Sequence, residues 1–362
     1  MYLDYIKKLT SGKSICIFPM GRAGTGLFDK MTSIGIHVDY FCDNNTSKVG
    51  TVYKGCNCIS KEELKENNEK TVIIIESLFY QEIKKQLENE GFINIHRIYF
   101  EKIAGERFIQ SHGDEVIEKA KEVKSILNDE KSNYVYDRII DSYYKDNLSD
   151  DYFRCICDKE QYFDDDIYRL SENECIVDLG AYTGDSAEAF IDKCNGKYKK
   201  LHLFELDPAI YRQLMINTQY LYSKTSKGII QCYPFGASDS NATVSLMVGD
   251  SSSKIISASN SDKYCIEGLV RSLDSVLSED EITLIKSDIE GAEMSALKGA
   301  KRIIKEQKPI LAFCIYHSLS DTINIPLWIK DIVPEYSIYI RHYTDLMLET
   351  VCYAIPKNRL VK

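Results

Sequence analysis

The chain has 362 residues, a net charge of −10 and a sequence pI of about 5.3. This length predicts two domains, or one domain with a large extension, and the acidic balance argues against binding to nucleic acids or anionic membranes, which requires a basic face. No apolar run approaches the ~18 residues of a membrane-spanning helix. The first residues, "MYLDYIKKLTSGKS", lack the apolar core of a secretory signal, so we expect a cytoplasmic protein.

The 12 cysteines do not follow a metal-binding pattern. There is no C-x-x-C pair, and the closest spacings, Cys56/Cys58 and Cys155/Cys157, have no histidines near them at zinc-finger spacing. We therefore expect reduced thiols in cores and loops, and no metal site.

Residues 14–100 alternate between predicted strands and helices. Apolar strands are expected at 14–20, 36–43, 71–77 and 94–100, and helices at 24–35 and 79–91. Such alternation is typical of βαβ units with a mainly parallel sheet, so a Rossmann-like domain is predicted over residues 1–104.

A helical connector is predicted over residues 105–170. The segment 114–127 places Val116, Ala120, Val123 and Leu127 on one helical face. Because the segment contains no tract rich in proline or glycine, we expect a packed connector rather than a flexible linker.

The alternation resumes in the predicted third segment, residues 171–362. Five strands are expected at 174–179, 200–206, 228–235, 282–288 and 309–317, with helices at 186–194 and 291–307 and one arm of an inserted hairpin at 243–248. The two last β runs, 336–343 and 349–356, are expected to pair as an antiparallel hairpin. The predicted fold class is α/β, with two doubly wound Rossmann-like domains.

The turn "DLGAYTG" follows the first strand of this segment. Gly180 and Gly184 would let the backbone approach a ligand, and Glu205 stands 21 positions after Gly184, where a carboxylate can bind ribose hydroxyls. This pattern fits either NAD or S-adenosylmethionine (SAM). Asp178 favours SAM, because an anion is poorly placed beside a pyrophosphate and suits a ligand with ammonium and sulfonium charges.

Residues 160–355 resemble an FkbM-type class I SAM-dependent methyltransferase. The matching stretches include "IVDLGAYTGDS", "LFELDP", "GASD", "IKSDIEGAEMSALKGA", "AFCIYH" and "YIRHY…ETVCYAIP". The resemblance implies a seven-stranded methyltransferase fold with an antiparallel terminal hairpin. It also implies a SAM pocket lined by ten residues: Asp178, Gly180, Ala181, Tyr182, Thr183, Gly184, Glu205, Leu206, Ala237 and Asp288.

Candidate catalytic residues lie at the ends of later strands. Asp288 ends the fourth strand, and Glu290 follows it; charge at a helix N-terminus is an equal alternative for Glu290 and the favoured one for Glu293. His317 ends the fifth strand, where it could titrate near neutrality and deprotonate a hydroxyl, or serve only as a structural histidine.

Two further candidates end the next predicted strand. Arg341 could bind a substrate phosphate or carboxylate, or form a surface ion pair, and His342 is a further catalytic candidate. A divalent metal at Asp288 and Glu290 has too few ligands to be predicted.

The N-terminal turn "IFPMGRAGTG" is a weaker dinucleotide pattern. Pro19 replaces the first glycine, Gly21 and Gly24 follow, and Asp43 lies 19 residues after Gly24, as a ribose-binding carboxylate would. A module that recognises a nucleotide sugar and a purely structural or dimerising domain are equal alternatives here.

The function expected from these observations is SAM-dependent methylation of a hydroxyl on a sugar, glycan or small-metabolite acceptor. One alternative is a nucleotide-sugar- or NAD-binding enzyme or module of polysaccharide biosynthesis with an accessory methyltransferase-like domain. Another is a non-catalytic binding module. The identity of the acceptor and a homodimeric state are left open.

Overall fold

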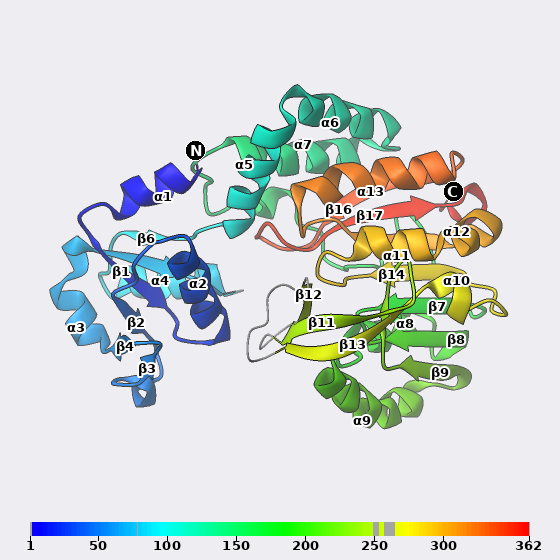
Figure 1. Ribbon diagram of the computed structural model, residues 1–362, viewed down its shortest axis with the longest axis horizontal. Helices are drawn as coiled ribbons and strands as arrows, with labels where there is room; N and C mark the ends of the chain where they lie inside the picture. Colours follow the sequence, from blue (N-terminus) through cyan, green and yellow to red (C-terminus); the bar gives the residue numbers. More distant parts are fainter. Residues whose placement is uncertain (1, 78, 249–252, 257–264, 362) are drawn as a thin grey trace. The chain divides into compact units, whose positions relative to one another are not determined.

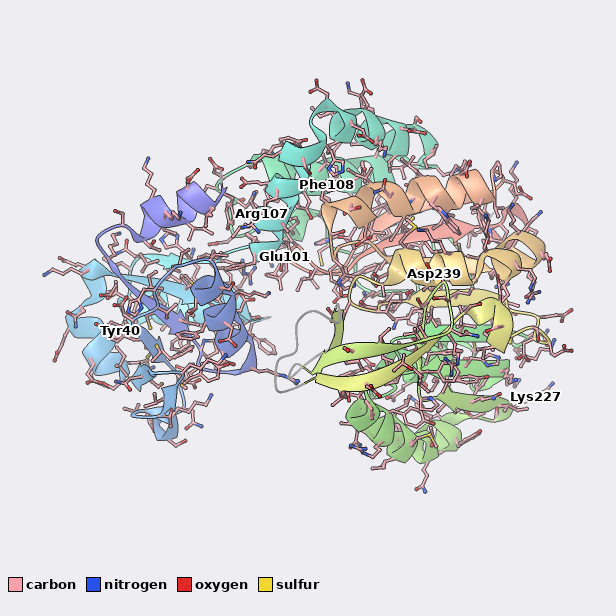
Figure 2. All side chains as sticks on the ribbon, viewed as in Figure 1. Tyr40, Glu101, Arg107, Phe108, Lys227 and Asp239 are labelled. Atoms are coloured by element: carbon pink, nitrogen blue, oxygen red, sulfur yellow. The ribbon has the colours of Figure 1, made fainter. Side chains whose placement is uncertain are left out.

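The structure is a computed structural model that describes residues 2–77, 79–248, 253–256 and 265–361. The chain forms two compact units: unit 1 comprises Met1–Arg107 and Ser142–Tyr152, and unit 2 comprises Phe108–Asp141 and Phe153–Lys362. The first division falls inside helix α5 (Phe100–His112), between Arg107 and Phe108 (Figure 2). In the described part of the chain, no helix is long and apolar enough to cross a membrane.

Unit 1 is built on a six-stranded sheet in the order β3-β4-β2-β1-β5-β6 (Figure 1). Its strands are β1 (Ser14–Phe18), β2 (Tyr40–Cys42), β3 (Val52–Tyr53), β4 (Cys56–Ile59), β5 (Thr71–Ile75) and β6 (Ile95–His96). All pairings are parallel except β3 with β4. The helices are α1 (Tyr2–Thr10), α2 (Arg22–Ser33), α3 (Lys61–Glu66), α4 (Tyr80–Asn89) and the start of α5.

The four predicted strands of unit 1 are confirmed, with shorter bounds. All five residues of β5 are buried, which explains why this uninterrupted apolar run forms a central strand. The β3–β4 hairpin was not predicted; its turn contains Lys54 and Gly55, both with positive φ.

Unit 2 is built on a seven-stranded sheet in the order β16-β17-β15-β14-β7-β8-β9. Its strands are β7 (Cys175–Leu179), β8 (Lys197–Phe204), β9 (Lys227–Tyr233), β14 (Leu284–Ser287), β15 (Ile310–Cys314), β16 (Ser337–His342) and β17 (Thr350–Ile355). The first five are parallel, and β16 and β17 pair as the predicted antiparallel hairpin. The direction of winding reverses between β7 and β14, and ligands bind at the carboxyl ends of strands at such a point.

Helices of unit 2 gather in two groups. One group, α8 (Asp185–Lys193) and α9 (Pro208–Lys224), contacts β8 and β9; the other contains α6 (Asp114–Ile126), α11 (Glu293–Gly299) and α13 (Leu319–Ile332), of which α13 also contacts β17 (Figure 1). The helix predicted over 291–307 is interrupted at Ala300, so that α12 (Lys301–Gln307) follows α11 as a separate helix. The remaining helices of unit 2 are α10 (Leu273–Val276) and α7 (Glu130–Tyr144), whose last residues belong to unit 1.

A second, four-stranded sheet contains the predicted inserted hairpin. Its order is β10-β13-β11-β12, formed by β10 (Gly236–Ala237), β13 (Cys265–Arg271), β11 (Ala242–Val248) and β12 (Ser253–Ile256). The predicted arm at 243–248 is strand β11, which pairs antiparallel with both β12 and β13.

The segment predicted as a connector, 105–170, divides between the two units. Residues 128–132 run beside β16, where Asn128 and Ile338 exchange backbone and side-chain hydrogen bonds and the Ser132 hydroxyl accepts from the Ile340 amide. These bonds explain why residues 108–141 belong to unit 2 rather than to a separate connecting element.

Candidate active site

The turn after β7 has a backbone that requires glycine. Gly180 and Gly184 have φ values of 75° and 97°, and a Cβ on Gly180 would overlap the backbone oxygen of Asp288. The amides of Gly180 and Ala181 both donate to the Phe204 carbonyl at the end of β8, at 3.1 and 2.9 Å. The turn is therefore held against the neighbouring strand while Tyr182, which is 41% exposed, projects from it.

Glu205 lies directly after β8 and faces the same turn. Its two carboxylate oxygens accept from the amides of Asp207 and Tyr182, at 2.8 and 3.0 Å. Burial raises the pKa of this carboxyl, and the backbone donors partly oppose that shift. Among the described residues no lysine or arginine forms an ion pair with Glu205, so its charge and remaining lone pairs can serve a ligand.

Asp178 has a different environment from the predicted one. Its carboxylate is fully buried and forms an ion pair with the Lys286 ammonium at 2.8 Å, while the Ser186 hydroxyl donates to it at 2.6 Å. Burial raises the pKa of Asp178 and alone would lower that of Lys286, but the carboxylates of Asp178 and Asp288 hold the pKa of Lys286 above its ordinary value. The charge that was predicted to attract a cationic ligand is thus neutralised inside the protein.

Lys286 also shapes the turn. Its ammonium donates to the Gly180 carbonyl at 3.0 Å and lies over the Tyr162 ring, 5.5 Å from the ring centroid. Sequence reasoning missed this residue, although a lysine inside the apolar run "ITLIKSD" is itself a signal of a buried partner.

Asp288, at the end of β14, is the centre of a hydrogen-bonded group. Its carboxylate accepts from the Tyr316 hydroxyl at 3.0 Å and the Tyr162 hydroxyl at 3.4 Å, and it contacts the His317 Nε2 at 3.2 Å. Burial would raise its pKa, but His317 and Lys286 hold the pKa at about 2. The side chain remains a quarter exposed, so it can also meet a ligand.

His317 does not titrate near neutrality as expected. Its Nε2 lies 3.2 Å from both Asp288 Oδ1 and Glu293 Oε1. Burial lowers its pKa, but the two carboxylates outweigh burial and raise the pKa to about 10. The ring is therefore an imidazolium at neutral pH and cannot accept a proton there, which corrects its predicted role as a base.

Glu293 is more than a surface charge at a helix start. It is fully buried, and its Oε1 accepts from the Ile289 amide at 2.8 Å besides contacting His317. Asp288, Glu293 and His317 bring their ligand atoms within 4.8 Å of one another, close enough to chelate a cation. The imidazolium proton already supplies the positive charge between the two carboxylates.

Glu349, which precedes β17, was also missed. Burial, with a further contribution from Asp288, raises its pKa to about 7, and the Gln161 amide donates to its carboxylate. A ligand atom of Glu349 lies within 4.8 Å of those of Asp288 and Cys314. A charged residue placed just before an apolar strand is its only sequence signal, because its partners are far away in the chain.

The structure does not support ligand binding by Arg341 or His342. Arg341 is 2% exposed, and its guanidinium is bound by Asp129 at 2.6 Å and Asp164 at 2.7 Å. His342 is fully buried, its Nδ1 lies 2.8 Å from the Thr350 hydroxyl, and burial lowers its pKa to about 4. The side chains of Arg341 and His342 connect β16 to adjacent segments of the chain. This corrects the predicted role of Arg341 in substrate binding and of His342 in catalysis.

The remaining predicted residues lie in β10, after β8, within the turn and before α11. Ala237 is buried in β10, Leu206 packs near Gly236 and Gly268 of the small sheet, and the Thr183 carbonyl accepts from the Asn217 amide at 2.8 Å. Glu290 is half-buried with a φ of 58° in the loop before α11.

The N-terminal turn of unit 1 is closed by its own side chains. Asp43 is 8% exposed and pairs with the Lys48 ammonium at 2.7 Å, and the same ammonium donates to the Met20 carbonyl at 2.8 Å. A Cβ on Gly24 would overlap the Pro19 oxygen. The carboxylate predicted to bind a ribose is therefore already engaged.

Two family models match the chain, one within each unit. Residues 178–339 match the family model of the methyltransferase FkbM domain, and residues 11–99 match the model described as C2185-like, N-terminal. None of the curated proteins matches the chain significantly.

Two solved structures show how far the likeness in fold extends. A crystal structure of methyltransferase FkbM from Methylobacillus flagellatus KT has a TM-score of 0.72 and 21% identity, covering 97% of this chain and 93% of that one. A precorrin-6y C5,15-methyltransferase from Geobacter metallireducens GS-15 has a TM-score of 0.31 and 10% identity, with 52% and 84% covered, which is too low to carry an argument. Together, the seven-stranded sheet and the family match show that residues 178–339 of unit 2 lie in an α/β domain similar to the methyltransferase FkbM domain.

Proposed function

We propose that unit 2 is a SAM-dependent methyltransferase that acts on a hydroxyl group of a sugar, glycan or other small metabolite. The observation that carries the proposal is Glu205, a nearly buried carboxylate at the end of β8 that is held by two backbone amides and by no cation. A carboxylate in this state is suited to accept hydrogen bonds from both hydroxyls of a ribose.

The residues around the turn fit the proposed cofactor. Gly180 and Gly184 adopt the positive φ angles of the turn, and Gly180 lets the turn lie against the Asp288 backbone at the end of β14. Tyr182 offers a partly exposed ring beside it. When bound, SAM supplies an electrophilic methyl group.

Asp178 acts indirectly in this proposal. Its ion pair with Lys286, together with the bond from Lys286 to the Gly180 carbonyl, fixes the shape of the turn. Asp178 and Lys286 are therefore positioning residues rather than direct ligands.

The acceptor side of the proposed site contains Asp288, Tyr316 and Glu349. Asp288 is held as an anion by His317 and Tyr316, which suits it to orient a hydroxyl but makes it a weak base. Glu349 has a pKa of about 7 and is only partly buried, so its carboxylate can take the hydroxyl proton near neutral pH. Glu349 replaces His317 as the proposed general base.

The test is a turnover assay with methyl-labelled SAM and a panel of sugars, glycans and hydroxylated metabolites, detecting S-adenosylhomocysteine and the labelled product. We expect a hydroxylated acceptor to be methylated at a rate that rises with pH through about 7, because the base must be deprotonated. Glu349→Gln should lower kcat about 100-fold and abolish that rise. SAM binding without turnover on any acceptor would instead favour a non-catalytic module.

A further inference from the structure

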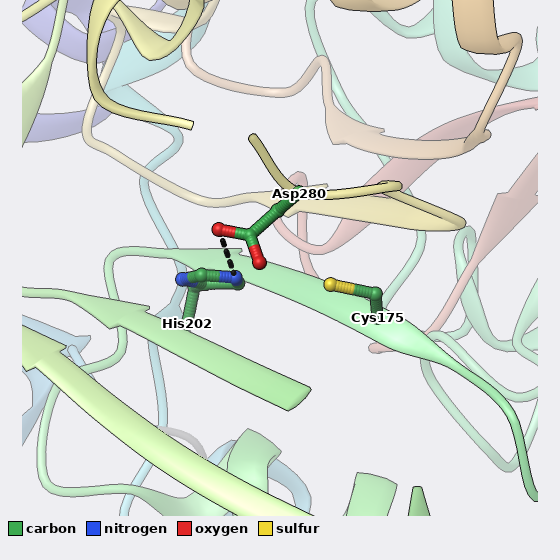
Figure 3. Close-up of side chains that lie close together, drawn as sticks. All are labelled: Cys175, His202 and Asp280. Carbon is green, nitrogen blue, oxygen red and sulfur yellow. Dashed lines mark ion pairs between the residues drawn. The ribbon is translucent and has the colours of Figure 1, made fainter. Parts of the chain in front are cut away.

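A second group of chemically active side chains lies away from the proposed methyltransferase site. Figure 3 shows Cys175, His202 and Asp280, whose ligand atoms all lie within 4.8 Å of one another. They come from the first residue of β7, from β8 and from the loop before β14. Cys175 lies four residues, about 13 Å, before the end of β7 where the glycine turn begins, so the two sites are at opposite ends of the strand.

The strand register brings these residues to one face of the sheet. Cys175 pairs with Lys200, and His202 lies two positions further along β8, so Cys175 and His202 point to the same side. Asp280 reaches this face from the loop before β14, the strand that borders β7 on its other edge. Three segments that are distant in the chain thus converge on one point.

His202 carries the strongest sign that something is bound there. It is fully buried, and its Nε2 has no hydrogen-bond partner among the described residues. Asp280 Oδ2 lies 3.6 Å from this nitrogen, which is too far for a hydrogen bond. Leaving a buried polar atom without a partner is unfavourable, so this nitrogen requires an explanation.

We infer that Cys175, His202 and Asp280 form a binding site for a soft divalent cation such as zinc. Sulfur, imidazole nitrogen and carboxylate oxygen are the ligands that zinc prefers, whereas magnesium and calcium prefer oxygen alone. Ligands of tetrahedral zinc lie about 3.3–3.8 Å from one another, and the 3.6 Å between His202 Nε2 and Asp280 Oδ2 falls within that range. A water molecule would complete the tetrahedron.

The surroundings of the cluster match those of a metal-binding histidine. The His202 Nδ1 lies 2.9 Å from the Tyr233 hydroxyl, and such a bond from the second ring nitrogen leaves Nε2 free to bind a metal. Asp280 is 26% exposed, which provides a route of entry from solvent. Zinc binding would release one proton from the Cys175 thiol, so that a thiolate binds the cation.

A catalytic cysteine–histidine pair is the competing explanation. Cys175 is 1% exposed and His202 is fully buried, which excludes a substrate from the sulfur and from the imidazole. A cation site that ties β7, β8 and the loop before β14 together is the better account.

Lys200 lies beside Asp280, and its positive charge provides a control for the proposed metal site. Its ammonium lies 3.1 and 3.2 Å from the two oxygens of Asp280 and therefore competes with a cation for that carboxylate. Removing this charge should tighten metal binding about tenfold, whereas it would have no such effect if the metal bound elsewhere.

The experiment is a Co²⁺ titration of the full-length, reduced protein after chelator treatment, followed by competition with Zn²⁺. We expect one equivalent of Co²⁺ to produce a thiolate-to-cobalt charge-transfer band with tetrahedral d–d bands, and Zn²⁺ to abolish both. Cys175→Ser and His202→Gln should remove the charge-transfer band, and Lys200→Gln should strengthen binding. Cys232→Ser is the matched control, because Cys232 of β9 pairs with Leu203 of β8 and points to the opposite face.

The cobalt spectrum of the wild type tests the proposed metal site even if a variant fails to fold. Absence of a thiolate band at saturating Co²⁺ overturns the proposal, as does a band that persists in Cys175→Ser or disappears in Cys232→Ser. Zinc should also raise the Tm of the wild type and of Cys232→Ser but not that of Cys175→Ser. An equal shift in all three proteins would place the metal at another site and contradict the inference.

Discussion

The two glycine turns of this chain have the same order of elements around them, but the acidic residues that face them have different hydrogen-bond partners. Each follows a buried parallel strand, opens a helix and has an acidic residue after the next strand. In unit 1 that residue, Asp43, is bound by Lys48, which also donates to the Met20 carbonyl of the turn. In unit 2 the corresponding Glu205 accepts from two backbone amides and has no lysine or arginine partner among the residues that the structure describes.

This difference shows why a glycine pattern is insufficient to identify a ligand site. A carboxylate already neutralised by a lysine offers little to a ribose, whereas one held by amides keeps its charge for the ligand. In unit 2 a lysine from β14, Lys286, pairs with Asp178 instead. Asp178 lies on β7, one strand away from Glu205 at the end of β8. We therefore propose that the turn at 178–184 binds a cofactor and that the turn at 19–24 does not.

The largest effect is expected from Gly180→Ala. Its positive φ and the overlap of a new Cβ with the Asp288 oxygen should lower the free energy of unfolding by about 4 kcal/mol and abolish SAM binding. Gly24→Ala is the matched change in unit 1, because its Cβ would overlap the Pro19 oxygen. It should destabilise unit 1 while the SAM affinity stays at the wild-type value, as measured by chemical denaturation and calorimetry. Loss of SAM binding in the Gly24 variant would remove the distinction between the two turns.

A smaller effect is expected from breaking the lysine pair of each turn. Lys286→Met leaves Asp178 buried without its cation and should cost about 3 kcal/mol in unfolding free energy. Lys48→Met should cost below about 1 kcal/mol, since Lys48 is 35% exposed and solvent screens the pair. Denaturation of both variants checks the contrast, and the double change Lys286→Met with Asp178→Leu should recover part of the lost stability. Equal costs for the two lysines would show that burial does not distinguish the pairs.

A smaller loss than that of Lys286→Met is expected for the charged group on the acceptor side of unit 2. His317→Gln should destabilise the protein by about 2 kcal/mol near pH 6.5, because Asp288 and Glu293 lose the cation between them. The pKa of His317 is raised from 6.5 to about 10, so its contribution is complete below pH 6.5 and is lost as the pH rises through 10. The pKa of Asp288 is lowered from 3.8 to about 2, so its contribution is lost as the pH falls through 2.

Denaturation of the wild type and the His317 variant across pH therefore checks both signs. The difference in unfolding free energy should be largest near pH 6.5 and should shrink toward pH 10. It should also shrink in acid, where the carboxylates of the variant take up protons. A difference that is constant with pH would show that His317 is not an imidazolium in the folded protein.

Local patterns predicted much of the fold and part of the site. The apolar run 71–75, the terminal hairpin and the glycine turn could be recognised because neighbouring residues carry their signals. The partner of Asp178 could not, because Lys286 lies 108 positions away and meets it only when β14 pairs with β7. Arg341 could be interpreted only as a substrate ligand or a surface ion pair for the same reason: its partners Asp129 and Asp164 belong to the segment predicted as a connector.

The protonation states of the residues in the site also could not be predicted from the sequence. His317 differs from an ordinary histidine only through Glu293 and Asp288, and Glu349 reaches a pKa of about 7 through burial beside Asp288. Burial and charge contacts of this kind depend on the packed structure. The sequence predicted the strand ends that carry Asp288 and His317, but it could not show that two carboxylates keep His317 protonated.

The most direct test of the central claim is calorimetric titration of SAM into the wild type, Glu205→Ala and Asp43→Ala. Our account predicts that the wild type binds, that Glu205→Ala loses affinity about 100-fold, and that Asp43→Ala binds as the wild type does. Glu205→Gln, which keeps an acceptor oxygen but loses the charge, should show an intermediate loss of about tenfold. No binding by the wild type, unchanged binding by Glu205→Ala, or a loss confined to Asp43→Ala would contradict it.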